Sequence, residues 1–504
     1  MADLREQLAA WLPSARDSLN DLRQSAAFDH IGTVETVGDG VVAVTGLPHA
    51  AMDEVLMFDG GALGLVMQVA PGRLSAVLLS GGDEITAGSK VVGTGEILRV
   101  PVGESLLGRV VDSTGAPLDG GAPIDALRHD PIERPAPGIV DRELVTQPLA
   151  TGVTVIDTMI PLGRGQRELI IGDRKTGKTA VAVDAIINQK STDVICIYAA
   201  VSQKTSSVNE VINTVRAHGA MERCIFVVGA PDTPPGQQWI TPYAACTMAE
   251  YFRDTGRDAL LIIDDLSKHA VVYRQLSLLL RRPPGREAYP GDVFYLHARL
   301  LERAAKLNDR LGGGSLTALP IAETQAGNMS AYIPTNLISI TDGQIYLEPK
   351  LFYEGQKPAV NVGMSVSRVG GRTQAPAMSG LADSLKLEYS QFLELEVFTR
   401  FGAIVDERTQ HTIDHGQRIR AILTQPENQP ITLAEQVALL LAVTGDKLDT
   451  VPLENVRRFK QNLRAGLEAK CPAAAKRIVE TGALSDSDRQ ALVTAVDALL
   501  AEGS

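Results

Sequence analysis

Eight consecutive residues have the types and spacing of a phosphate-binding loop. The run Gly172-Asp173-Arg174-Lys175-Thr176-Gly177-Lys178-Thr179 places four residues between two glycines and ends in Lys and Thr. Such a loop directs backbone N–H groups and a helix N-terminus at phosphate oxygens. Lys178 is expected to reach the β- and γ-phosphates, and the Thr179 hydroxyl is expected to ligate Mg²⁺. The motif therefore predicts a site for ATP or ADP with Mg²⁺.

The segments around this loop support the prediction. Residues 167–171 have the apolar character of a short buried strand, and residues 180–190 have the pattern of a helix with an apolar face. A later apolar run, residues 259–263, ends in Asp264 and Asp265. A carboxylate at the carboxyl end of a strand beside a phosphate loop can hold Mg²⁺. Asp264 is the predicted magnesium ligand, and Asp265 is an alternative N-cap for the next helix.

A residue able to activate water is missing from the expected place. Hydrolysis needs a group that orients or deprotonates the attacking water, usually a carboxylate in this class of α/β ATPase. The segment after the next strand offers Gln203 instead. An amide can hydrogen-bond water but cannot accept its proton. The sequence thus predicts a site that binds nucleotide and leaves it intact.

Arg368 is a second candidate for chemistry. It lies in a strand-like run, residues 360–371, that ends in two glycines. One interpretation is a solvated charge at a sheet edge. The other is an arginine that enters a neighbouring subunit's nucleotide site and stabilises charge on the transferred phosphoryl group.

The composition restricts the class of protein. The 504 residues are 44% hydrophobic and 21% charged, with a net charge of −12, and this length predicts about three domains. The acidic balance and the lack of a dense Lys/Arg run disfavour nucleic acid as the main partner. The four cysteines lack Cys-x-x-Cys spacing and are interpreted as buried free thiols. The sequence has neither a long apolar window nor a signal-peptide core.

The pattern of apolar residues and glycine turns divides the chain into four segments, and the predicted fold is multidomain. Residues 1–27 contain an amphipathic helix, over 2–24, that packs either on a partner or on its own domain. Residues 28–96 contain short strands between glycine turns and predict a β-barrel. Residues 97–380 alternate strands with helices, as in an α/β P-loop (RecA-like) nucleotide-binding domain, with a hairpin predicted around Asp342-Gly343. Residues 381–504 predict an α-helical bundle, with a Thr432–Glu435 capping box.

With these pieces assembled, the chain resembles the alpha subunit of F-type ATP synthases over essentially its full length. The resemblance is carried by these blocks: Val37-Gly-Asp-Gly-Val, Leu107-Gly-Arg-Val-Val-Asp, Pro161-Leu-Gly-Arg-Gly-Gln-Arg-Glu-Leu-Ile-Ile, Leu278-Leu-Leu-Arg-Arg-Pro-Pro-Gly-Arg-Glu-Ala-Tyr-Pro-Gly-Asp, Ile333-Pro-Thr-Asn and Ser365-Val-Ser-Arg-Val-Gly. The resemblance implies a β-barrel, a nucleotide-binding domain and a helical bundle. It also implies three such chains alternating with three catalytic beta subunits around a gamma shaft.

Site residues and partners follow from the same resemblance. Gln203 stands where the beta subunit has its catalytic glutamate, so the alpha site is implied to be non-catalytic and regulatory. Arg368 falls at the position of the family's arginine finger, which completes the beta subunit's catalytic site across an interface. Ser339 falls at the family's other contact with that beta-subunit site. The N-terminal helix would bind a delta-type stator subunit. The assembly would lie on the cytoplasmic face of a bacterial inner membrane, and its membrane sector would couple ATP synthesis or hydrolysis to proton or sodium transport.

Several positions depart from the family pattern. Lys175 replaces a common glutamine in the loop. In the implied adenine pocket, Phe352 and Gln425 match, whereas Lys357 replaces an Arg and Glu427 replaces a Gln. Similar divergence occurs in the second, sodium-associated F-type ATPases of some bacteria. Two other functions were weighed: a self-sufficient hexameric P-loop ATPase, disfavoured by Gln203, and a ring helicase, disfavoured by the acidic charge.

Overall fold

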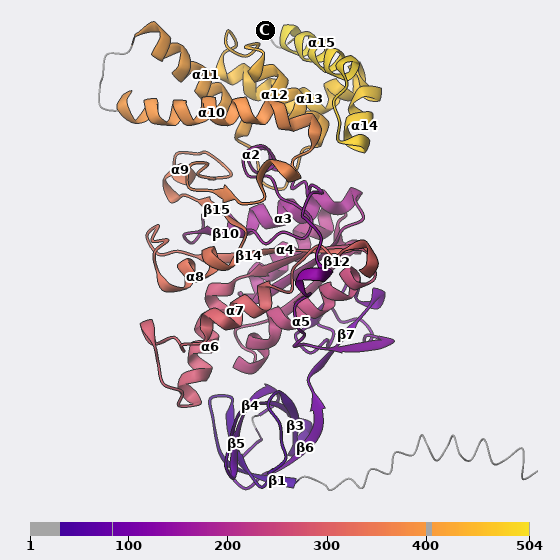
Figure 1. Cartoon of the computed structure of the whole chain (residues 1–504), viewed down its shortest axis with the longest axis vertical. Helices are drawn as coiled ribbons and strands as arrows, with labels where there is room; N and C mark the ends of the chain where they lie inside the picture. The colour runs from indigo at the N-terminus through magenta and orange to yellow at the C-terminus, as the bar shows by residue number, and fades with distance from the viewer. Residues whose placement is uncertain (1–30, 83, 400–405, 503–504) are drawn as a thin grey trace, which may run out of the picture. The chain divides into compact units, whose positions relative to one another are not determined.

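Residues 31–82, 84–399 and 406–502 are described by the computed structural model (Figure 1). The helix predicted over 2–24, together with its stator contact, lies outside these residues. The described part of the N-terminal region up to Leu98 forms one compact unit, and Arg99 onward forms a second. None of the helices in the described ranges combines the length and apolar character needed to cross a lipid bilayer.

A closed β-barrel makes up the first unit. Its strands run in the order β1-β2-β5-β4-β3-β6, with the bounds β1 Ile31–Gly38, β2 Val41–Thr45, β3 Glu54–Phe58, β4 Leu63–Ala70, β5 Arg73–Ser80 and β6 Lys90–Ile97. Alternate side chains such as Val42, Leu56 and Val66 fill its interior. Sequence patterning found five of these strands. It missed β6 because Gly93 and Gly95 interrupt the alternation of that strand.

An eight-stranded sheet organises the first part of the second unit. Its order is β16-β15-β10-β14-β13-β11-β12-β8, and only the β15–β16 pair is antiparallel. The bounds are β8 Val110–Asp112, β10 Leu169–Gly172, β11 Ile195–Val201, β12 Cys224–Gly229, β13 Asp258–Asp264, β14 Ser315–Glu323, β15 Gly343–Leu347 and β16 Val366–Ser367. Every residue of β11 and β12 is buried, as expected for parallel strands covered on both faces. A small sheet pairs β7 (Arg99–Val102) with β9 (Arg128–Pro131).

Helices alternate with these strands, as the sequence predicted. They are α2 Thr154–Met159, α3 Lys178–Asn188, α4 Thr205–Ala217, α5 Pro235–Asp254, α6 Leu266–Leu279, α7 Val293–Leu301, α8 Tyr332–Ile340 and α9 Pro349–Tyr353. The long helix α5 lies against the central strands β11, β12 and β13. All four cysteines are buried and free, in agreement with their interpretation as core thiols.

The hairpin predicted around Asp342-Gly343 is wrong. The segment before the turn is helix α8, and only the segment after it is a strand. Ile333, Leu337 and Ile340 recur at helical spacing and are buried, so tertiary packing on one helical face overrides the local β-propensity of the isoleucines. The strand-like run around Arg368 forms ladder pairs only at Val366 and Ser367.

Within residues 376–399 and 406–502, six helices follow the sheet. They are α10 Pro376–Thr399, α11 Glu407–Leu423, α12 Leu433–Thr444, α13 Leu453–Lys470, α14 Pro472–Thr481 and α15 Asp486–Glu502. The Thr432–Glu435 capping box is present at the start of α12. Side chains of these helices, such as Tyr389 and Leu440, belong to the same hydrophobic core as Ile170 and Tyr198 of the sheet. Sheet and helices therefore share one core.

A matched pair of glycine substitutions tests the packing of α10 on α11. A Cβ on Gly416 would lie 2.0 Å from Cγ of Phe392, whereas a Cβ on Gly380 would meet no atom within 4 Å. Gly416→Ala is expected to destabilise the chain by about 1–3 kcal/mol through overpacking. Gly380→Ala, in an exposed helix interior, is expected to stabilise it by about 0.5–1 kcal/mol. Thermal unfolding monitored by circular dichroism measures both shifts, and a neutral Gly416→Ala contradicts the close α10–α11 contact.

Candidate nucleotide site

The phosphate loop joins β10 to α3, as the sequence predicted. Gly172 ends the strand, and a Cβ there would lie 2.4 Å from the Leu347 carbonyl oxygen, so only glycine fits. Gly177 is the residue before α3 and has a φ of 93°, a conformation that glycine adopts without strain. Lys175 has a φ of 61° and is exposed. The loop thus places the N-terminus of α3 beneath a ready-made anion site.

Lys178 is held at the start of the loop. Its Nζ donates to the carbonyl oxygens of Gly172 at 3.0 Å and Asp173 at 2.6 Å. Burial lowers the pKa of this ammonium, and the charges of surrounding carboxyl groups oppose the shift. Around it, the Thr176 hydroxyl donates to the Asp173 carbonyl at 2.8 Å. The exposed Arg174 pairs with Glu323 at 2.8 Å.

The Asp264 carboxylate is the centre of the site beside the loop. Its Oδ2 accepts from the Thr179 hydroxyl at 2.9 Å and from the Tyr198 hydroxyl at 2.6 Å. Its Oδ1 accepts from the Gln203 amide at 2.6 Å. A Thr hydroxyl and an acidic side chain at this separation form the oxygen donor set that holds Mg²⁺ beside phosphates. The two residues predicted as metal ligands are therefore brought together.

Gln203 is fixed on both sides. Its amide nitrogen donates to Asp264, and its amide oxygen accepts from Nζ of Lys268 at 2.6 Å. This arrangement holds the side chain at the magnesium ligand, and a neutral amide has no site at which to store a proton from water.

The carboxyl groups whose charges act on Lys178 are all engaged. They are Glu323, Asp265, Asp264 and Asp173. Glu323 pairs with Arg174, and Asp265 caps α6 by accepting from the Lys268 backbone N–H at 2.6 Å. Burial and the neighbouring Asp264 raise the pKa of Asp265 to about 7. Asp173 accepts from the Gly327 backbone N–H at 2.9 Å. Each of these acids therefore has a partner within the protein.

Three of the four residues expected near the adenine base, Phe352, Lys357 and Gln425, also meet. Nζ of Lys357 lies 4.6 Å from the centre of the Phe352 ring, a cation–π contact. The backbone N–H of Gln425 donates to the Lys357 carbonyl at 2.7 Å. The Gln425 amide itself binds the backbone of Gly152, the backbone and hydroxyl of Thr154 and the Gln429 carbonyl. Its observed role is to join the loop after α11 to the segment before α2, and its contact with a base stays a prediction.

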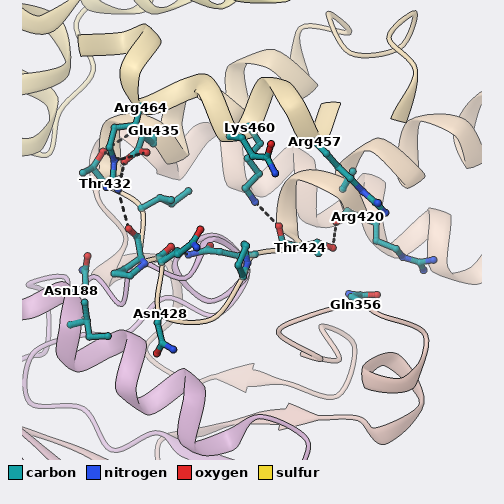
Figure 2. Close-up of a pocket in the computed structure, with 18 of the residues that line it drawn as sticks. Asn188, Gln356, Arg420, Thr424, Asn428, Thr432, Glu435, Arg457, Lys460 and Arg464 are labelled. Atoms are coloured by element: carbon teal, nitrogen blue, oxygen red, sulfur yellow. Dashed lines mark hydrogen bonds and ion pairs between the residues drawn. The ribbon is translucent and has the colours of Figure 1, made fainter. Parts of the chain in front are cut away.

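A cavity of about 1050 Å³ lies beside that loop, between the end of α3 and helix α13. Figure 2 shows Lys460 pointing from α13 towards Thr424, whose carbonyl oxygen accepts from its Nζ at 2.7 Å. Burial lowers the pKa of Lys460 to about 8. The same side of the cavity carries Arg464, which pairs with Glu435 at 3.1 Å (Figure 2). The cavity therefore adjoins Gln425 and is bordered by cations on the side of the helices.

Arg368 lies away from the phosphate loop, bonded to a residue that closely follows Ser339 in the chain. Arg368 is exposed, and its backbone N–H donates to the carbonyl of Asp342, three residues after Ser339. The ladders pair Gly172 with Leu347 but Gly343 with Ser367. These pairs are four residues apart along β15, or about 13 Å at roughly 3.3 Å per residue. Arg368 is thus near the opposite end of β10 from the chain's own phosphate loop.

Glu168 lies beneath Arg368. It is fully buried, and burial raises its pKa well above the usual range, although the positive charge of Arg368 opposes that shift. Its Oε2 accepts from the Gln166 amide at 2.7 Å, and its Oε1 has no hydrogen-bond partner among the described residues.

Sequence reasoning missed four partners of the site: Tyr198, Lys268, Glu323 and Glu168. Tyr198 and Glu323 lie within strands, where an apolar run or strand end gives no sign that a polar tip reaches the site. Lys268 follows the Asp264-Asp265 pair by one helical turn, so its spacing was a usable signal.

The chain matches two family profiles. Residues 152–367 match the nucleotide-binding domain of the ATP synthase alpha/beta family, and residues 374–499 match the C-terminal domain of the ATP synthase alpha/beta chain. Together these matches cover the phosphate loop, the strands of the large sheet other than β8, and nearly all of the helices α10 to α15.

Several bacterial relatives are similar over nearly the full length. ATP synthase subunit alpha 2 of Gluconobacter oxydans is 54% identical over 488 residues, covering 97% of this chain and 96% of the relative. ATP synthase subunit alpha 3 of Paraburkholderia xenovorans is 53% identical over 500 residues, covering 99% and 94%. ATP synthase subunit alpha 1 of the same species is 55% identical over 443 residues, covering 88% and 87%.

Asp184 on α3 gives the site a pH-dependent stability. Burial and the nearby Glu427 raise its pKa to about 7, against the opposing effects of the Asn428 backbone N–H and His218. Because its carboxyl pKa is higher in the folded chain than in the unfolded chain, folding binds a proton between about pH 4 and 7. Its contribution to stability is therefore lost as pH rises through that window.

Asp184→Asn is expected to remove this dependence, because asparagine stays neutral and keeps an acceptor for Asn428. The melting temperature of the variant should exceed that of the parent chain at pH 8, and the difference should shrink towards pH 5. Asp497→Asn, at an exposed carboxylate paired with Lys447, is the control. Equal melting temperatures of parent and Asp184→Asn at pH 8 contradict the raised pKa.

Proposed function

The chain belongs to the ATP synthase alpha/beta family, and on that premise we propose that its own nucleotide site is non-catalytic while Arg368 serves a neighbouring subunit. The chain itself has the alpha role in a rotary F-type ATPase. In this proposal the phosphate loop binds ATP or ADP as a regulatory site. Thr179 and Asp264 hold the Mg²⁺, which neutralises phosphate charge when bound.

The amide of Gln203, in the place where a carboxylate was expected, supports the non-catalytic half of the proposal. Gln203 stands between Asp264 and Lys268, with both ends of its amide hydrogen-bonded. Of the carboxyl groups that act on Lys178, Asp265 caps a helix N-terminus, Asp173 accepts from a backbone donor and Glu323 pairs with Arg174. Bound nucleotide would be oriented by the loop, but no described group there is disposed to deprotonate a nucleophile.

The position of Arg368 is the observation that supports the second half of the proposal, in which this arginine serves a neighbouring subunit. It is exposed, about 13 Å along the sheet from the end of the phosphate-loop strand, a separation beyond the span of its side chain. Among the described residues its guanidinium makes no side-chain hydrogen bond, while its backbone is fixed to Asp342. An exposed arginine whose backbone is held in this way is suited to stabilise phosphoryl charge across a subunit interface. Ser339, also exposed, would contact the same neighbouring site.

Partners and location follow as part of the proposal. Catalytic beta subunits would alternate with this chain in a ring around a gamma shaft, and a delta-type stator subunit would bind the N-terminal segment. The ring would lie at the cytoplasmic face of a bacterial inner membrane, linked through other subunits to a proton- or sodium-translocating sector. The chain would thereby contribute to ATP synthesis or hydrolysis without turning over its own nucleotide.

Arg368→Ala is expected to lower ATPase activity of the reconstituted alpha–beta–gamma assembly by about 10³-fold, as loss of an arginine finger does. Binding of a fluorescent ATP analogue to the isolated chain should not change, because Lys178 and Asp264 are untouched. Arg372→Ala, at an exposed arginine four residues away, is the control. Activity within about threefold of the parent assembly, roughly 0.7 kcal/mol in barrier, excludes the finger role.

Gln203→Glu is expected not to create rapid hydrolysis at the chain's own site. The new carboxylate would lie beside the Asp264 carboxylate and pair with Lys268, which would hold it ionised but away from water. Single-turnover hydrolysis by the purified chain, with and without the substitution, measures this. Fast turnover by the variant would show that only the carboxylate was missing, and fast turnover by the parent chain would favour a self-sufficient ATPase.

A further inference from the structure

Two histidines of α11 and a turn after α12 form a polar cluster remote from the nucleotide site. His411 and His415 are four residues apart on α11, and their rings are nearly parallel, with an interplanar angle of 7°. Residues four apart project from the same side of a helix. Both imidazoles lie against Asp449, which follows α12 by five residues. Glu388 of α10 and Asp446 complete the cluster.

The geometry within this cluster is that of ligand atoms around a cation. Nε2 of His411 lies 3.5 Å from Oδ2 of Asp449, and Nε2 of His415 lies 3.3 Å from Oε2 of Glu388. Neighbouring ligands of a tetrahedral zinc ion with bonds of about 2.0–2.1 Å are separated by about 3.4 Å. One ligand atom each from His415, Asp446 and Asp449 lies within 4.8 Å of the other two, so small side-chain rotations close the set.

Contacts within and around the cluster hold its side chains in place. Nδ1 of His415 lies 2.8 Å from Oδ1 of Asp449, so the imidazole and this carboxylate fix one another's orientation. Arg418 donates to the carbonyl oxygens of Leu448 and Val451 and so fixes the turn that carries Asp449. Arg418 pairs with none of the three carboxylates, and no described Lys or Arg forms a salt bridge with them.

We propose that His415, Asp446 and Asp449, with His411 as a further ligand, bind a divalent transition-metal cation of the Zn²⁺ class. Imidazole nitrogen with carboxylate oxygen is the donor set of Zn²⁺, Co²⁺ and Ni²⁺, whereas Mg²⁺ and Ca²⁺ take oxygen donors. Three carboxyl groups meet with no Lys or Arg paired to them among the described residues, so with neutral imidazoles a bound dication would offset their charge. The cation would join α11 to the turn between α12 and α13.

Co²⁺ titration of the full-length chain in a large excess of Mg²⁺ tests this site, because Mg²⁺ occupies oxygen-only positions such as that at Asp264. One Co²⁺ per chain is expected, with the visible absorption of a nitrogen-containing low-coordinate site, and Zn²⁺ should displace it. His415→Asn and Asp446→Asn should each weaken binding at least about 10-fold. His129→Asn, at an exposed histidine of β9, should leave affinity and spectrum unchanged.

A second readout separates a metal ligand from a merely structural residue. Saturating Zn²⁺ should raise the melting temperature of the parent chain and of His129→Asn, since a ligand that binds only the folded state stabilises it, and should fail to raise that of His415→Asn. Asp446 is exposed, so Asp446→Asn remains informative if His415→Asn folds poorly. The proposal is overturned if the parent chain binds no Co²⁺ in excess Mg²⁺, or if both variants bind within about threefold of the parent.

Discussion

The parallel register of β10 and β15 is the constraint on which the rest of the molecule depends. It fixes the phosphate loop at the carboxyl end of β10, where the helix α3 begins. The short antiparallel strand β16 then pairs at the amino end of β15, so Arg368 leaves the sheet far from that loop. Lys178 and Arg368, the two cations that the proposal assigns to phosphate, are thereby separated within one chain. This separation of Lys178 from Arg368 is set by the backbone hydrogen bonds of the strands and not by side-chain contacts.

A single carboxylate integrates the loop with the sheet. Asp264 receives hydrogen bonds from α3 through Thr179, from β11 through Tyr198 and from the following segment through Gln203. Two of these donors are neutral hydroxyls and the third is an amide, so they orient the carboxylate without neutralising it. Its charge stays available for a cation, while Lys268 holds the far end of Gln203. The same network places a neutral amide, Gln203, beside the predicted magnesium ligand.

Much of this could be read from the sequence because its motifs are local. The loop, its flanking strand and helix, the Asp264 position and the Thr432 cap each depend on residues within a few positions of one another. The prediction that failed depended on packing. The end of α8 was predicted as one strand of a hairpin, but Ile333, Leu337 and Ile340 are buried on one face of a helix. The role of Gln425 likewise required contacts with Gly152 and Thr154, some 270 residues earlier. Side chains that reach a site from inside an apolar strand, such as Tyr198, carry no sequence signature.

The hydrogen bonds of Gln425 have a mechanical consequence. They clamp the connection between α11 and α12 to the residues that lead into α2, and the adjoining backbone bond holds Lys357. The phosphate loop is anchored separately, through the β-ladder of β10. A tilt of the helical bundle would therefore displace the base-side contacts while the triphosphate side stayed in place. If the base binds beside Gln425 as predicted, nucleotide would by reciprocity bias the angle of the bundle by the same free energy that the bundle's angle imposes on nucleotide affinity.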